Sequence, residues 1–163
     1  MKKIELNREY AMRHLLAAAV FVALGCWFGY DGFVRSPAAD AAALYESIEK
    51  APPPADMSQA KLDAFKAQKT KTQFVLAIVT LGAALLVALH LLSVAGFKFA
   101  FDDDGFVLRG KRFAWSDVKN VDESLWEKKS VLRISGDGWG ATLDAWHHVG
   151  VKELRERLKS KSL

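Results

Sequence analysis

The sequence predicts a membrane helical hairpin of two spans, followed by a small α+β domain. Two long apolar stretches occupy much of the first hundred residues, and hydrophobic residues alternate with polar ones after residue 97. A helix buries a stripe at a period near 3.6 residues, whereas a strand buries every second side chain. We therefore divide the chain into an N-terminal segment 1–14, a first span 15–34, a loop 35–72, a second span 73–97 and a domain 98–163.

The second span is defined by the absence of charge. Residues 73–97 contain no Asp, Glu, Lys or Arg and are rich in Leu, Val and Ile. A helix of that length rises about 36 Å, which is enough to cross a hydrocarbon core of about 30 Å. The stretch is therefore predicted to be a transmembrane helix.

The first span is apolar except for Asp31 near its end, and basic residues precede it. A basic segment before an apolar run also describes a secretory signal, and the small residues at 38–41 would suit cleavage. The run is long for a signal, however, and aromatic residues such as Trp27 and Tyr30 gather at one end, as in an interfacial belt. An uncleaved span is the favoured interpretation, and a cleaved signal is the alternative.

The distribution of basic residues favours both termini in the cytoplasm. Eight flank the two spans on the proposed cytoplasmic side, and six lie in the loop: Lys2, Lys3, Arg8, Arg13, Lys98, Arg109, Lys111 and Arg112 against Arg35, Lys50, Lys61, Lys66, Lys69 and Lys71. Lys and Arg concentrate on the cytoplasmic side of membrane proteins. We expect a multi-pass protein of a bacterial cytoplasmic membrane, with an extracytoplasmic helical loop broken at Pro52-Pro53-Pro54.

Small residues recur at helical spacing within both spans. They are Ala19, Ala23, Gly25 and Gly29 in the first span and Thr80, Ala84 and Ala88 in the second. Small side chains let helices approach closely in lipid, so these positions predict packing of the two spans on each other. Contacts with a second copy or another membrane protein are the alternative. His90, the one histidine within the predicted spans, is expected to make an interfacial or interhelical hydrogen bond.

The last third predicts short antiparallel strands closed by a helix. Phe97, Phe99 and Phe101 share one strand face, and the run 102–105 predicts a turn. Further alternating segments follow up to residue 143, and an amphipathic helix is expected at 149–159.

This part of the chain resembles bacterial PH-like domains. The resemblance rests on an aromatic-rich hairpin, the segment Gly-Lys-Arg-Phe-Ala-Trp-Ser-Asp-Val-Lys-Asn-Val at 110–121, two further strands and a terminal helix. It implies an antiparallel PH-like sheet closed by a C-terminal helix, often attached to a pair of transmembrane helices. The segment is shorter than a complete seven-strand PH fold, which leaves open a truncated sheet or one completed by a neighbour. The resemblance implies a binding or scaffolding module without chemistry of its own.

The basic hairpin at 109–112 has two interpretations. Arg109, Lys111 and Arg112 lie close in sequence to the second span and would suit anionic lipid headgroups, or they form an ordinary charged hairpin facing water.

Several kinds of site are not predicted. The formal charge of +4 is modest and spread out, which argues against nucleic-acid binding, and Cys26 is the only cysteine. The acidic run 102–104 and the pair His147-His148 lack the further ligands of a calcium or zinc site. We therefore expect no catalytic, cofactor or metal site and no enzyme activity.

The favoured function is a small integral membrane protein whose cytoplasmic domain binds or scaffolds. The alternative is an accessory or stabilising subunit of a larger membrane complex. Its expected partners are the lipid bilayer and either another membrane protein or a second copy of this chain.

Overall fold

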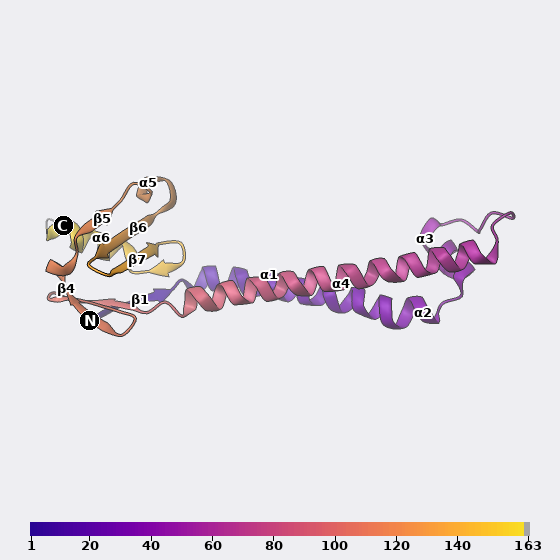
Figure 1. The fold of residues 1–163 in the computed structure, drawn as a ribbon, viewed down its shortest axis with the longest axis horizontal. Helices are drawn as coiled ribbons and strands as arrows, with labels where there is room; N and C mark the ends of the chain where they lie inside the picture. The colour runs from indigo at the N-terminus through magenta and orange to yellow at the C-terminus, as the bar shows by residue number, and fades with distance from the viewer. Residues whose placement is uncertain (162–163) are drawn as a thin grey trace. The chain divides into compact units, whose positions relative to one another are not determined.

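The computed structural model describes residues 1–161, and the chain divides into two compact units (Figure 1). One unit is helical and comprises Leu15–Ala88. The other combines Met1–His14 with Leu89–Leu163 and contains the β-strands. Each unit is described separately below.

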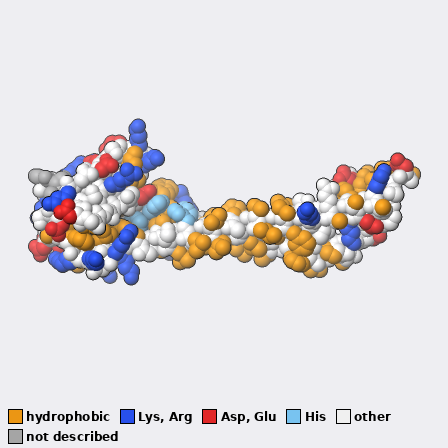
Figure 2. Space-filling view, viewed as in Figure 1, with side chains coloured by type: hydrophobic (Ala, Val, Ile, Leu, Met, Phe, Trp, Pro, Cys, Tyr) orange, Lys and Arg blue, Asp and Glu red, His pale blue; other side chains and the backbone are white. Residues whose placement is uncertain are grey.

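Two long helices account for the predicted spans. Helix α1 (Arg8–Tyr30) continues through a π-helical segment η1 (Asp31–Arg35) into α2 (Ser36–Ala38), and α4 covers Gln59–Ala95. These helical stretches contain 31 and 37 residues and are long and apolar enough to cross a bilayer. In the space-filling view, hydrophobic side chains cover much of the visible surface of both helices (Figure 2). Helix α1 begins before residue 15 and α4 begins before residue 73, so both extend into polar sequence. Helix α4 ends at Ala95, two residues before the predicted end of the second span.

The connection between the helices is itself ordered by specific contacts. Helix α3 (Ala41–Glu49) is capped by the Asp40 carboxylate, which accepts hydrogen bonds from the backbone N–H groups of Ala42 and Ala43 at 3.0 and 3.2 Å. The Lys66 ammonium group donates to the carbonyl oxygens of Pro37 and Ala39 at 2.9 and 2.7 Å. Pro52, Pro53 and Pro54 lie between the end of α3 and the start of α4, outside both helices.

The strands form two antiparallel sheets. A five-stranded sheet has the order β4-β3-β2-β1-β8, and a three-stranded sheet has the order β5-β6-β7. The strands are β1 (Lys2–Leu6), β2 (Phe99–Phe101), β3 (Gly105–Leu108), β4 (Lys111–Ala114), β5 (Asn120–Asp122), β6 (Val131–Gly136), β7 (Trp139–Asp144) and β8 (His148–Val149). A 3-10 helix η2 (Trp115–Asp117), a short helix α5 (Trp126–Lys129) and the helix α6 (Val151–Ser160) complete the unit.

One core holds the two sheets and α6 together. Phe106, Leu132, Leu143, Leu154 and Leu158 are each 0% exposed within it. The alternating strands and the C-terminal helix predicted for this region are thus confirmed, and the sheet is antiparallel as expected.

The N-terminal residues are the main departure from the predicted organisation. Residues 1–14 were expected to be a separate segment, but Lys2–Leu6 forms β1 inside the five-stranded sheet. Strand β1 pairs with β2 through Ile4↔Phe99 and with β8 through Leu6↔His148. The sheet is therefore completed by residues of the same chain that precede the first span.

Candidate binding site

The outer face of the three-stranded sheet carries polar side chains. Along β5, β6 and β7 the inward positions hold Val121, Ile134 and Ala141, which are paired across the sheet. Because side chains alternate in a strand, the positions between them face outward. Those outward positions hold Asn120, Asp122, Arg133, Ser135, Gly140 and Thr142.

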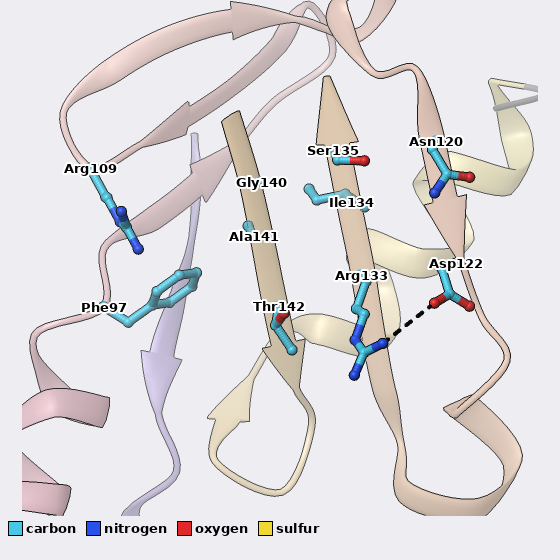
Figure 3. Close-up of a pocket in the computed structure, with 10 residues that line it drawn as sticks. All are labelled: Phe97, Arg109, Asn120, Asp122, Arg133, Ile134, Ser135, Gly140, Ala141 and Thr142. Carbon is cyan, nitrogen blue, oxygen red and sulfur yellow. Dashed lines mark ion pairs between the residues drawn. The ribbon is translucent and has the colours of Figure 1, made fainter. Parts of the chain in front are cut away.

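This face forms one wall of a groove of about 490 Å³. Phe97, from the segment between α4 and β2, and Arg109, from the β3–β4 turn, form the opposite side (Figure 3). In Figure 3 both side chains extend toward β7, and the outward residues of β5, β6 and β7 lie across from them. The groove thus joins residues from the five-stranded and three-stranded sheets.

Two guanidinium groups and one carboxylate set the charge of the groove. Arg133 lies 3.8 Å from the Asp122 carboxylate (Figure 3). Hydrogen bonds from the Ser124 hydroxyl and backbone N–H lower the pKa of Asp122, and Arg133 lowers it further. Arg109 forms no ion pair within residues 1–161. With Asp122 ionised, the groove carries one uncompensated positive charge.

Backbone geometry adds further hydrogen-bonding groups. β7 is an edge strand of the three-stranded sheet in the described part of the chain, so one side of its backbone has no strand partner. Gly140 has no side chain and leaves this part of the groove open. The lining residues therefore combine guanidinium, amide, hydroxyl and backbone groups, which together suit a ligand carrying a carboxylate or phosphate group.

The three predicted headgroup residues occupy different surroundings. Arg109 faces the groove, and Lys111 is exposed at the start of β4. Arg112 lies 3.3 Å from the Asp102 carboxylate, and this pairing lies at the turn between β2 and β3. These three basic residues are close in sequence, but their side chains have different surroundings in the structure.

The small residues predicted to pack between the two spans differ in burial. Gly25 is buried, and a Cβ atom added there would lie 2.6 Å from the Leu81 side chain and 3.1 Å from the Thr80 hydroxyl. Ala84 is buried, and Ala88 is half-buried. Ala19 and Ala23 are exposed, and a Cβ atom at Gly29 would meet nothing within 4 Å. Gly25 and Thr80 therefore mark a close approach of α1 and α4, and Ala19, Ala23 and Gly29 do not.

The four histidines of the chain gather where the helices join the sheets (Figure 2). The Tyr10 hydroxyl and the His90 Nε2 atom are 2.7 Å apart, which confirms the interhelical hydrogen bond predicted for His90. The Tyr10 ring also lies close to those of His14 and His147, with centroids 4.0 and 4.5 Å away. Within residues 1–161 no group of three or more His, Cys, Asp and Glu residues has the arrangement of a metal site.

His147 and His148 lie at the start of strand β8 and have different surroundings. His148 lies in β8, is 6% exposed and approaches the Val94 carbonyl oxygen at 3.3 Å. His147 precedes the strand, and its Nδ1 atom is 3.7 Å from the Asp144 carboxylate. Burial lowers the pKa of His147, and the neighbouring histidines lower it further, although Asp144 acts in the opposite direction.

The Trp-Ser-Asp segment has a structural role. Trp115 is 6% exposed, and its indole N–H donates to the Asp102 carbonyl oxygen at 3.2 Å. The Asp117 carboxylate accepts a hydrogen bond from the Ala114 backbone N–H at 2.8 Å and so fixes the η2 turn. Trp115 and Asp117 therefore stabilise the fold around η2, and neither residue lines the groove.

The groove residues on β5, β6 and β7 were not predicted. Arg133, Ser135 and Thr142 belong to no recognisable motif, and Asn120 lies in the segment 110–121 but was not singled out. The proximity of the four residues depends on strand register. Comparison with protein-family models, curated proteins and solved structures found no match to this chain.

Proposed function

We propose that this chain is an integral protein of a bacterial cytoplasmic membrane whose sheet domain serves as a binding module. The observation that carries the proposal is the pairing of β1 with β2 and β8. Because β1 precedes the first apolar helix and β2 follows the second, both ends of the helical hairpin return to one sheet. A two-span hairpin with both termini on the same side of the membrane satisfies this pairing.

The same pairing supports retention of the first span. Cleavage near residues 38–41 would remove β1, which lies between two other strands of the sheet. It would also separate Ile4 from its partner Phe99, and both side chains belong to the core. The excess of basic residues on the side of the termini supports a cytoplasmic location for the sheet domain.

Insertion and topology are tested together on the full chain. Carbonate-washed membranes are expected to retain the protein, and a C-terminal alkaline phosphatase fusion is expected to be inactive. Strong phosphatase activity would reverse the topology, and complete extraction by carbonate would overturn membrane insertion.

The arrangement of strands also supports the proposal of a PH-like module. Residues 98–163 alone are short for such a fold, and β1 supplies one strand from outside that range. The sheets end in the amphipathic helix α6, in the order that the resemblance implies.

The groove is the proposed ligand site of the module. Arg109 and Arg133 face a common space beside an edge strand, and Asp122 balances one of the two charges. We therefore assign it a ligand or partner segment bearing a carboxylate or phosphate group. Paired guanidinium groups bind such oxygens through charge-assisted hydrogen bonds.

Site-specific photocrosslinking in native membranes tests the groove. A benzophenone amino acid replacing Thr142 is expected to give discrete crosslinks that weaken in the R109Q/R133Q variant. The matched control replaces Asp137, which lies in the β6–β7 turn outside the groove. Identical products at both positions, or none at Thr142, would contradict a groove ligand.

A second candidate is an accessory subunit of a larger membrane complex. The exposed small residues Ala19, Ala23 and the open space beside Gly29 favour it, because small residues permit close helix approach. Mild detergent extraction followed by native electrophoresis distinguishes the two. A large assembly would favour the subunit, and a free monomer or dimer would contradict it.

A further inference from the structure

Both helices leave the five-stranded sheet at the same end. Strand β1 ends at Leu6, one residue before α1, and β2 begins at Phe99, shortly after α4 ends at Ala95. The antiparallel register Ile4↔Phe99 places these two junctions side by side. We call this end the helix-proximal rim.

Three further segments lie at this rim. The β3–β4 turn is tied to it by a hydrogen bond from the Arg109 N–H to the Lys98 carbonyl oxygen at 3.0 Å. The loop before β8 is held by Asn7, whose backbone N–H donates to the His147 carbonyl oxygen at 2.8 Å. Helix α5 is brought there by the pairing Val131↔Asp144 and by the Ala145 N–H, which donates to the Ser130 carbonyl oxygen at 3.0 Å.

The rim carries cations without protein partners. They include Arg8, Lys98, Lys111, Lys128 and Lys129, and within residues 1–161 none of these forms an ion pair.

Several carboxylates at this rim have protein partners, whereas Glu5 of β1 forms no ion pair within residues 1–161. Glu9 pairs with Arg13, Glu123 and Glu127 lie 2.7 and 3.8 Å from Arg155, and Asp144 is 3.7 Å from His147. The charge that this rim offers to an external partner is therefore positive.

Trp146 gives the rim an exposed aromatic side chain. It is 55% exposed, and the Arg13 guanidinium carbon lies 5.4 Å from its ring centroid. The Asn7 side-chain amide donates to the Trp146 carbonyl oxygen at 3.1 Å, which fixes the loop beside the start of α1. Arg13 is two residues from Leu15, where the predicted span begins. Tryptophan and arginine at this depth are typical of the membrane–water interface.

The opposite end of the sheet domain has a different character. Its β2–β3 turn contains Asp102, Asp103 and Asp104, and its β6–β7 turn contains Asp137. A negatively charged lipid surface would attract the rim. At the opposite end it would meet Asp104 and Asp137, whereas Asp102 and Asp103 pair with Arg112 and Arg157.

We propose that the helix-proximal rim binds the anionic lipid headgroups of the membrane that holds the helices, with Trp146 seated at the interface. This inference rests on the proposed membrane insertion and adds the lipid class and the contacting residues. Basic residues beside a membrane bind acidic lipids by an attraction that salt screens. The contact would fix the orientation of the sheet domain against the membrane.

Lipid-dependent quenching on the full chain tests the proposal. In a Cys26→Ala background, Trp146→Cys is labelled with an environment-sensitive fluorophore, and Asp137→Cys is labelled as the control. Each protein is reconstituted into vesicles of phosphatidylcholine alone or with about 30% phosphatidylglycerol, the lipid class that charges the surface negatively. A headgroup nitroxide then quenches labels that touch the membrane.

The label at position 146 is expected to be quenched at least twofold more in phosphatidylglycerol vesicles than in phosphatidylcholine vesicles. The K128Q/K129Q variant should lose most of that difference, whereas K119Q/K161Q, which removes the same charge away from the rim, should keep it. Equal quenching in the two lipids, or equal loss in both variants, would overturn the proposal.

Carbonate extraction of the same vesicles separates the two hypotheses. A chain that stays in the membrane but shows no lipid dependence at position 146 refutes only the rim contact. A chain that carbonate removes refutes membrane insertion and, with it, the rim contact.

Discussion

The two units of this chain use similar apolar side chains in opposite ways. In the sheet domain Leu132, Leu143 and Leu154 are 0% exposed, whereas Leu16, Ile78 and Leu86 in the helical unit are between 68% and 72% exposed. Leaving such side chains in water is unfavourable by roughly 1.5–3 kcal/mol each. The comparison teaches that the sheet domain buries its large apolar side chains in a core of its own, whereas the helical unit leaves many of them on its surface.

The largest expected effect comes from opening the sheet-domain core. Leu143→Ala is expected to lower the free energy of unfolding by about 2–5 kcal/mol, because the cavity lies among fully buried neighbours. Urea unfolding of the full chain in micelles, followed by tryptophan fluorescence, measures the loss. The matched variant Leu86→Ala, in the exposed part of α4, should change this transition little. Equal losses would remove the contrast between the units.

Charge substitution tests what surrounds each unit. Ile78→Arg places a charge on an exposed site of α4, at an expected insertion cost of about 2.5–3.5 kcal/mol if that site faces lipid. The fraction of protein retained in carbonate-washed membranes should fall. Val149→Arg, at a site of the sheet domain that is 59% exposed, should leave retention unchanged. Normal retention of Ile78→Arg would show that α4 does not face hydrocarbon.

Helix packing provides a more local test. Gly25→Leu is expected to cost about 1–3 kcal/mol, because even its Cβ atom would lie 2.6 Å from the Leu81 side chain. Gly29→Leu is the control, since nothing lies within 4 Å of the corresponding Cβ position. Thermal unfolding of the helices in detergent, measured by circular dichroism, should show a lower midpoint for the first variant alone. A shift at Gly29 of the same size would place the helix contact elsewhere.

The smallest expected effect is a pH dependence at the junction. Burial holds the pKa of His147 below its ordinary value of 6.5, so the folded protein binds a proton less readily than the unfolded chain. Stability is therefore expected to fall as the pH decreases below 6.5 toward the folded-state pKa. Urea midpoints measured between pH 5 and 8 report this slope, and His147→Gln should reduce it. An unchanged slope in that variant would assign the dependence to other groups.

Local pattern predicted the two apolar helices, the β2–β3 hairpin and helix α6. The two apolar helices follow from uncharged runs, and the hairpin of β2 and β3 follows from alternation around the acidic turn at 102–104. Helix α6 follows from Leu154 and Leu158 at helical spacing. Each of these signals is contained within a short window of sequence.

Strand β1 and the groove could not be predicted in this way. Ile4 and Leu6 alternate with charged residues over only five positions, and the partner of Ile4 is Phe99. The groove brings Arg109 to face Arg133 and Thr142, which depends on how two sheets pack. Similarly, Tyr10 and His90 meet only because both helices enter the sheet at one end. Long-range pairing leaves little trace in a single sequence.

The position of β1 has a consequence for biosynthesis. This strand precedes both long helices in the chain, whereas one of its neighbours, β8, follows them and is therefore translated much later. At about 5–20 residues per second, β1 waits on the order of ten seconds for its last partner to leave the ribosome. During that interval the two long helices α1 and α4 are synthesised. If these helices form a membrane hairpin, insertion of only one of the two spans would leave β1 and β8 on opposite sides of the membrane, and the five-stranded sheet could not close.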